Sequence, residues 1–201
     1  MNKQHETIDN IPFFPLGIVV LPGETRFLHI FEQRYKNLFD DIADSDCRFA
    51  IPFVSKGRME GIASLVKFEK TLAKYPNGEV DIAVKGIDLV TVNRYYLEHP
   101  ERMYPYGDIE RLNKNTVTAT SGLLAVFDKY NDQVLKLDLT QYPALNFYVI
   151  ANSIGLTDTE KYDMLIRHGD DAINRTLINH LRLRAILASQ QNSLQEYYCL
   201  N

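Results

Sequence analysis

The sequence has little cysteine, no tryptophan and no strong excess of either charge. Its 201 residues include only two cysteines, Cys47 and Cys199, which lie far apart and form no C-x-x-C pair. We therefore expect two reduced thiols in a cytoplasmic protein rather than a disulfide framework. The net charge of -4 argues against a general nucleic-acid binder, which normally carries a basic excess.

Long apolar runs are also absent. No run reaches the length of about 18 residues that a membrane-spanning helix needs, so we expect no membrane partner. Residues 1–10 are polar and lack the apolar stretch of a secretory signal. A chain of this length with 45% hydrophobic residues can bury a core without disulfide or metal support.

The common catalytic motifs are missing as well. The sequence contains no P-loop, no G-x-G-x-x-G, no G-x-S-x-G and no H-E-x-x-H, and its histidines are dispersed: His5, His29, His99, His168 and His180. We expect no enzyme activity, no cofactor and no metal site. An enzyme that assembles dispersed residues such as His29, Arg34 or Asp88 is kept as a third hypothesis. His29 lies in an apolar segment, which favours a hydrogen-bonded core or edge residue over a ligand.

The first half of the chain is rich in short β-branched and aromatic runs. Strands are predicted over residues 11–16, 26–30, 49–54, 62–68, 80–84 and 87–92. Asn77-Gly78 before the alternating Val80–Val84 is typical of a hairpin turn. Many short strands at this spacing predict a sandwich or a small closed barrel. One amphipathic helix, from Phe31 to Ile42, interrupts them.

The period becomes helical after about Asn115. Helices are predicted over residues 117–136, from Pro143 to a stop at Gly155, after a capping box at Thr157–Glu160, and from Asp170 or Asp171 onward. The final helix has an apolar stripe that includes Ile173, Leu177, Leu181 and Leu187. We predict a β-rich domain at residues 1–115 and a helical bundle at residues 116–201.

Two features suggest binding. The sequence has 12 tyrosines, and the clustered Tyr95, Tyr96, Tyr104 and Tyr106 are candidate protein-binding residues, because tyrosine is enriched in interfaces. A half-buried strand or an interdomain seam would explain the same cluster. The second feature is the mildly basic segment 56–74, followed by Tyr75, which is the candidate surface for RNA.

Several motifs carry a family resemblance. Residues 11–23 read IPFFPLGIVVLPG and residues 28–35 read LHIFEQRY. These segments resemble the opening signature of the Lon-protease N-terminal (substrate-binding) domain. Gly61-Ile62-Ala63, Pro76-Asn77-Gly78 and Val84-Lys85-Gly86-Ile87 are similar to later segments of that family. Asp88-Leu89 departs from the family pattern, in which an arginine-containing continuation is usual.

The resemblance implies an α+β fold, with a PUA-like β-barrel followed by a helical bundle. Within it we expect unusual backbone angles at Gly23 and Gly86. We expect Phe31, Arg34 and Tyr35 to hold the helix against the barrel, with Arg34 paired to Glu32 or to a barrel carboxylate. These residues then determine the fold and have no catalytic role.

The resemblance also directs the functional expectation. Full Lon proteases follow this domain with an ATPase module and a peptidase domain, and the sequence ends at Asn201 without them. We expect a free-standing, non-catalytic protein- or peptide-binding module that recognises clients or acts as an adaptor. Its partners would be unfolded or partly folded polypeptides, or a protease. The alternative is an RNA-binding PUA-like barrel protein.

Overall fold

The computed structural model describes residues 7–43, 47–97, 103–112, 117–142, 145–167 and 169–199. The chain divides into two compact units, residues 1–115 and residues 116–201. The first contains an antiparallel sheet and one helix, and the second is helical, so the predicted α+β class is confirmed. That these units are a barrel subdomain with one inserted helix and a helical-bundle subdomain stays a prediction. Within the described ranges, no helix has both the length and the apolar character required to cross a bilayer.

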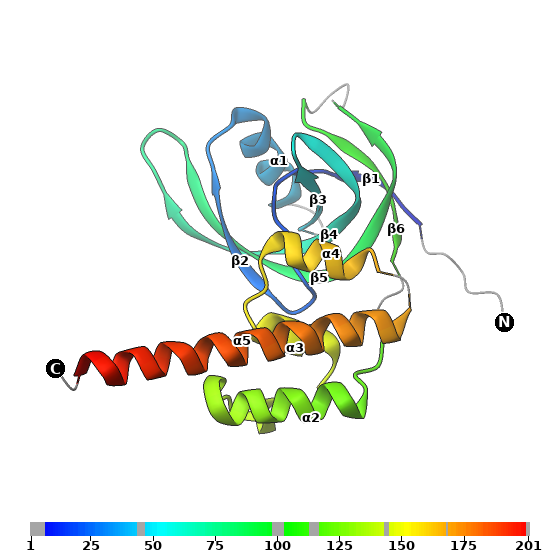
Figure 1. The fold of residues 1–201 in the computed structure, drawn as a ribbon. Coiled ribbons are helices and arrows are strands. Elements are labelled where there is room, and N and C mark those ends of the chain that lie inside the picture. The colour runs from blue at the N-terminus through cyan, green and yellow to red at the C-terminus, as the bar shows by residue number, and fades with distance from the viewer. Residues whose placement is uncertain are drawn as a thin grey trace. The chain divides into compact units, whose positions relative to one another are not determined.

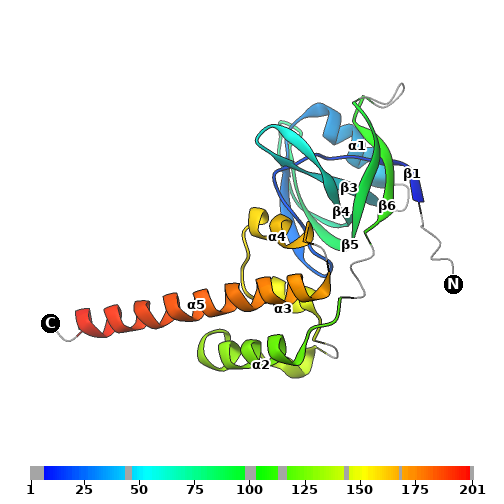
Figure 2. The ribbon, with the colours of Figure 1, turned by 45° about the vertical axis from the view of Figure 1, so that its right-hand side comes forward.

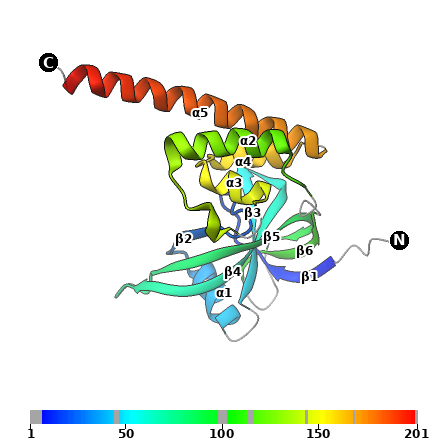
Figure 3. The ribbon, with the colours of Figure 1, turned by 90° about the horizontal axis from the view of Figure 1, so that it is seen from below.

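The first unit is built on one sheet (Figure 1). Its elements are β1 (Thr7–Pro12), β2 (Thr25–Ile30), α1 (Gln33–Ala43), β3 (Arg48–Ser55), β4 (Arg58–Lys74), β5 (Val80–Tyr96) and β6 (Tyr106–Arg111). The strand order is β1-β6-β5-β4-β3, and β2 pairs with β5. The predicted hairpin turn is confirmed, with Gly78 at φ +79° between the two long strands β4 and β5. This hairpin extends beyond the rest of the sheet (Figure 3).

The sheet is not closed into the predicted barrel. Its terminal strands β1 and β3 share no ladder, and the segment after β1 reaches β3 through two isolated parallel bridges, Phe13 to Ala50 and Leu16 to Phe53. The prediction of a strand over residues 11–16 was therefore wrong, because the strand lies earlier, at Thr7–Pro12. Prolines at positions 12 and 15 have no amide N–H, and a continuous ladder cannot run through them. The strand β6 was not predicted.

Helix α1 packs on the sheet as its sequence pattern predicts. Tyr35 is buried, and its ring lies 4.2 Å from that of Phe14 between centroids. Arg34 pairs with Glu32 at 2.8 Å, as expected. The expectation for Phe31 was wrong, because its side chain is 60% exposed. Phe31 precedes the helix and continues the outward-facing row of β2, so its ring does not enter the core.

The two glycines that the sequence singled out differ in their roles. Gly23 has φ +82°, in the left-handed region, as predicted. Gly86 does not lie in that region, and the prediction of an unusual angle there was wrong. A Cβ at Gly86 would lie 2.2 Å from the carbonyl oxygen of Leu21. Gly86 is thus required for close backbone approach and not for its backbone angle.

The second unit contains α2 (Ser121–Tyr130), a π-helical turn (Asn131–Leu135), a 3-10 turn (Leu139–Gln141), α3 (Phe147–Ser153), α4 (Asp158–Leu165) and α5 (Asp170–Cys199). Figure 2 shows α2 beside α5, which extends well past it. Gly155 has φ +64° after α3, and the capping box of Thr157 and Glu160 opens α4, so both signals are confirmed. The third helix begins at Phe147 behind an Asn146 cap. Pro143, its predicted first residue, lies outside the described residues.

Candidate functional site

A groove of about 400 Å³ lies between α1 and the β4–β5 hairpin. Its apolar lining comes from both sides, with Phe39 from α1 and Phe68 from β4. Ile30, Val80 and Ile82 add further aliphatic surface. The helical period of α1 turns Phe39 toward the sheet, and the Asn-Gly turn lets β4 and β5 fold back as one long hairpin. Local sequence patterns thus build both walls of the groove.

The rim of the groove is polar. Lys36 stands on the α1 side, and its ammonium group donates to the carbonyl oxygen of Asn77 in the hairpin turn at 3.4 Å. Gln33, Asp40, Thr71 and Lys74 complete the polar lining. An apolar floor below mixed amide, hydroxyl and charged groups is typical of a binding groove. The rim carries no pairing of a nucleophile with a histidine base, which acyl-transfer chemistry would require.

The structure places Tyr104 in the core and not on a binding surface. Its side chain is 1% exposed, and its hydroxyl donates to the Asp41 carboxylate in α1 at 2.8 Å. Tyr104 is therefore not available to a partner, and the candidate set loses this residue. Its hydrogen bond instead links α1 to the segment that leads into β6.

The other three predicted tyrosines gather where β5 meets β6. Tyr96 stacks on Tyr106 with centroids 4.8 Å apart, and Tyr95 stacks on Phe13 at 5.9 Å. Burial raises the pKa of Tyr95. The stacked pair borders a polar hollow of about 370 Å³ that Arg94 also lines. Tyr96 is 40% exposed, whereas Tyr104 is buried and Tyr95 packs on the buried Phe13, so the predicted tyrosines do not form one exposed patch.

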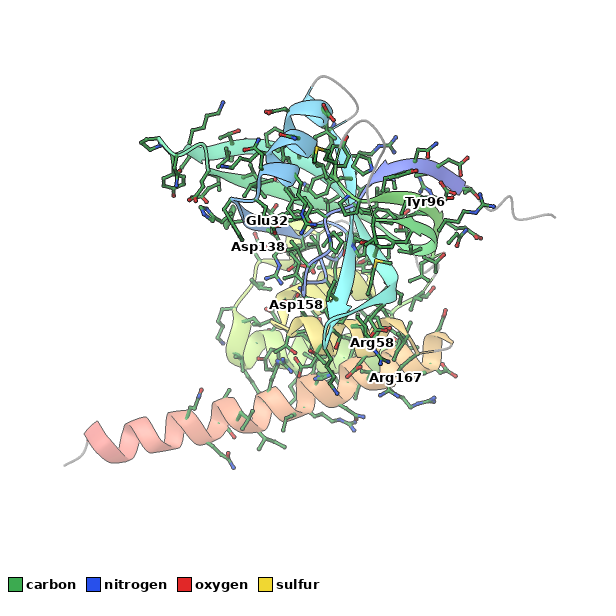
Figure 4. The ribbon with its side chains drawn as sticks, turned by 90° about the horizontal axis from the view of Figure 1, so that it is seen from above. Glu32, Arg58, Tyr96, Asp138, Asp158 and Arg167 are labelled. Carbon is green, nitrogen blue, oxygen red and sulfur yellow. The ribbon has the colours of Figure 1, made fainter. Side chains whose placement is uncertain are left out.

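This tyrosine cluster is separate from the groove. Figure 4 shows the labelled Tyr96 well apart from Glu32, which precedes α1. Strand β5 explains the separation, because Tyr96 ends that strand whereas the groove lies at its beginning, near Val80.

His29 occupies an edge position on β2. Its ring donates to Asp81 at 2.7 Å and lies 3.2 Å from the Glu79 carboxylate. The Tyr75 hydroxyl donates to the second oxygen of Asp81 at 2.6 Å. The hydrogen bond to Asp81 raises the pKa of His29, and the hydrogen bonds from Tyr75 and His29 lower the pKa of Asp81. The edge interpretation of His29 is confirmed.

The dispersed-enzyme hypothesis finds no assembled site in the described part of the chain. His29 faces Asp81, Arg34 faces Glu32, and the buried Asp88 pairs with Arg111 at 2.9 Å. These are separate contacts. The described residues also hold no group of three or more His, Cys, Asp and Glu side chains placed to bind a metal ion.

Sequence reasoning missed the groove itself. Phe39 and Phe68 each appeared as ordinary apolar positions of a helix and a strand, and their separation in the chain hides their proximity. The signal that could have found the site is the length of the hairpin. Strands β4 and β5 have 17 residues each, and a hairpin longer than the sheet beside it creates a second wall for α1.

Solved structures show the same fold. The chain is similar to a Lon N-terminal domain protein from Xanthomonas campestris, with 22% identity and a TM-score of 0.63. That match covers 90% of this chain and 98% of the other. It is also similar to the N-terminal domain of the Mycobacterium avium complex Lon protease, with 17% identity, a TM-score of 0.61, and coverage of 86% and 98%.

No curated protein matches the chain. A family model described as the ATP-dependent protease La (LON) substrate-binding domain matches residues 10–166. This range begins within β1, includes all the other strands of the sheet, and continues through α4. The chain therefore belongs to the LON substrate-binding domain family.

Proposed function

We propose that this protein is a non-catalytic, cytoplasmic module that recognises unfolded or partly folded polypeptides. The family description supports a substrate-recognition module. The observation that carries the proposal is the groove between α1 and the β4–β5 hairpin, with its apolar floor and polar rim. The groove takes an apolar side chain of a client against the surface that Phe39 and Phe68 form together, with their ring centroids 6.4 Å apart.

The chemistry of the rim fits a polypeptide. Lys36, Lys74 and Asn77 supply hydrogen-bond donors, which suit the carbonyl groups of a client main chain. Thr71 and Gln33 can both donate and accept. A rim of this kind recognises main chain with little demand for sequence, while the floor rewards apolar side chains.

The RNA-binding alternative is not supported. The residue proposed to stack on bases, Tyr75, donates its hydroxyl to Asp81 and lies edge-on to His29 at 5.8 Å. Carboxylates of Asp81 and Glu79 stand beside it. Negative charge next to the stacking ring repels a phosphate backbone, so this surface does not suit RNA.

The test uses a fluorescent, reduced and alkylated polypeptide that cannot fold, with its native disulfide-bonded form as competitor. We expect saturable binding of the unfolded form and weak competition by the native form. Thr71→Trp places an indole at the groove lining and should weaken binding by about tenfold. Arg58→Trp is the matched control, because Arg58 begins the same strand and lies away from Glu32 and α1 (Figure 4).

Two results would contradict the proposal. Equal binding by Thr71→Trp and Arg58→Trp would remove the groove as the site, and absence of saturable binding would remove polypeptide recognition altogether. The non-catalytic part is tested on the same samples. The labelled polypeptide should stay full length on a denaturing gel after prolonged incubation, and accumulation of fragments would refute it.

A further inference from the structure

Among the residues that the structure describes, strand β2 has one unpaired edge. Its residues from Thr25 to Ile30 pair with Lys85 to Val80 of β5, and within the described ranges β5 is its sole partner. Gly86 donates its N–H to the carbonyl of Glu24 at 2.9 Å, which sets the alternation of the antiparallel ladder. Arg26, Leu28 and Ile30 therefore direct their backbone groups toward β5. The N–H and C=O groups of Thr25, Phe27 and His29 point to the opposite side.

This edge strand is short and carries Arg26, but it lacks the proline, lysine and β-bulge that protect many exposed strands. Proline, lysine or a β-bulge usually interrupts pairing with another chain. Strand β1 ends in Pro12 and has a register shift after Ile8, and β3 has Pro52 followed by a shift. Strand β2, with the sequence TRFLHI, has neither proline nor lysine, and its six residues pair in unbroken register. Its backbone is therefore ready to accept a further strand.

The outward side chains of β2 form an aromatic row. Phe27 is 70% exposed and Phe31 is 60% exposed, and the His29 ring between them stacks on Phe31 at 6.1 Å. The intervening Leu28 and Ile30 are buried on the other face. This spacing of two residues matches the side-chain repeat of an extended peptide, whose alternate residues would lie beside Phe27, His29 and Phe31.

The negative charge near His29 favours some peptide side chains over others. The imidazole faces the carboxylates of Asp81 and Glu79. With His29 protonated the three groups carry one net negative charge, and with His29 neutral they carry two. A basic side chain beside His29 is therefore favoured, and an acidic one is opposed.

We propose that the free edge of β2 binds an extended segment of unfolded polypeptide as an added strand, with apolar side chains beside Phe27 and Phe31 and a basic side chain beside His29. The main-chain ladder supplies affinity, and the outward row supplies the preference. This inference rests on the proposed function and names the binding mode and peptide class. The outward side chains of β2 lie on the face of the strand opposite the groove, because Ile30 lines the groove while its neighbours His29 and Phe31 face outward.

The experiment uses a short peptide of about nine residues with apolar residues on either side of a central lysine at alternate positions. Two further versions carry N-methyl groups on one or the other set of alternate amides. Strand addition uses one set only, so one N-methylated peptide should bind about tenfold more weakly and the other should bind like the parent. Replacing the central lysine by glutamate should also weaken binding.

Two variants separate the backbone from the ring. Phe27→Pro removes an N–H that points away from β5 and leaves the β2–β5 ladder intact, whereas Phe27→Ala removes the ring but keeps the N–H. We expect Phe27→Pro to lose more binding than Phe27→Ala. In the unmodified protein, hydrogen exchange should show new protection of the Phe27 and His29 amides when the parent peptide binds, which needs no variant to fold.

The outcomes separate the two proposals. Equal binding of both N-methylated peptides, or protection at α1 and Thr71 without protection at Phe27, would overturn the edge site and leave groove recognition standing. Protection of Phe27 and His29 that rises with protein concentration alone would also overturn it, because the occupant would then be a second copy of this chain. If neither the peptide nor the unfolded polypeptide of the previous test binds, the proposed function itself fails.

Discussion

Aromatic residues lie on the strands beside both halves of β5, but these two neighbouring strands differ in how their own backbones are paired. Its first half, Val80–Lys85, pairs with β2, whose Phe27 is exposed. Its second half pairs with β6, and there Tyr96 and Tyr106 stack on each other. Aromatic content alone therefore does not reveal a binding surface. What distinguishes the halves is whether the strand next to β5 has a neighbour of its own.

The difference has a physical origin in the sheet. Strand β6 lies between β5 and β1, so its backbone groups are paired on both sides. Strand β2 has a partner on one side within the described residues, and its outward rings face solvent. We expect the β6 half of β5 to respond to substitution mainly through stability, and the β2 half mainly through binding. The following predictions test this division.

The largest effect is expected for Gly107→Ala in β6. A Cβ there would lie 2.1 Å from the carbonyl oxygen of Arg94 and 2.6 Å from the Phe13 ring. Backbone atoms cannot yield cheaply, and the free energy of unfolding should fall by about 3 kcal/mol or more in urea denaturation. Gly61→Ala in β4 is the matched control, because a Cβ there meets nothing within 4 Å. Similar losses in the two variants would contradict the close-approach argument.

The next effect is expected for Tyr104→Phe. Loss of the hydroxyl leaves Asp41 without that donor and should lower the free energy of unfolding by about 1–2 kcal/mol. Asp41→Asn keeps an acceptor and should cost less. Chemical denaturation of both single variants and the double variant gives the coupling energy, and a value near zero would show that the hydrogen bond contributes nothing.

A smaller effect is expected for the stacked tyrosines. Single alanine variants at Tyr96 and Tyr106, together with the double variant, should give a coupling energy of about 0.5–1 kcal/mol for the stack. These variants should leave peptide affinity unchanged. A loss of peptide binding comparable to that of Phe27→Pro would restore the tyrosines as a binding surface and break the division between the two halves.

Phe27→Ser should change the free energy of unfolding by no more than about 0.5 kcal/mol, because the ring is already mostly in water. The same variant should weaken binding of the apolar peptide. Urea denaturation and fluorescence anisotropy on one preparation measure both quantities. A large loss of stability with unchanged binding would reverse the assignment of this half of β5.

The smallest effect concerns protonation at the β2 edge. The hydrogen bond to Asp81 raises the pKa of His29, so its stabilising contribution is complete below the ordinary histidine pKa and is lost as pH rises through the raised value. Asp81 has a lowered pKa, so its contribution is present above the ordinary aspartate pKa and is lost as pH falls through the lowered value. NMR titration should show the His29 pKa falling in Asp81→Asn. An unchanged His29 pKa would contradict the pairing.

Much of the fold could be predicted where a local pattern has one physical solution. The Asn77-Gly78 turn, the capping box at Thr157 and the left-handed Gly23 were correct for this reason. The closed barrel and the role of Phe31 in holding the helix against it were wrong, because both depend on contacts between distant segments. Proline interrupts strand pairing after β1, and no local pattern indicates which strand then lies beside the segment that follows.

The candidate sites show the same limit to what local sequence patterns predict. The sequence by itself determined the family motifs, the elements and their hydrophobic faces, because period, turn and capping preferences act over a few residues. Only the tertiary structure decided that Tyr104 is buried, that Phe39 and Phe68 face one groove, and that β2 keeps a free edge within the described part of the chain. These properties depend on which backbone groups and surfaces find partners far along the chain, and such pairing is settled when the sheet assembles as a whole.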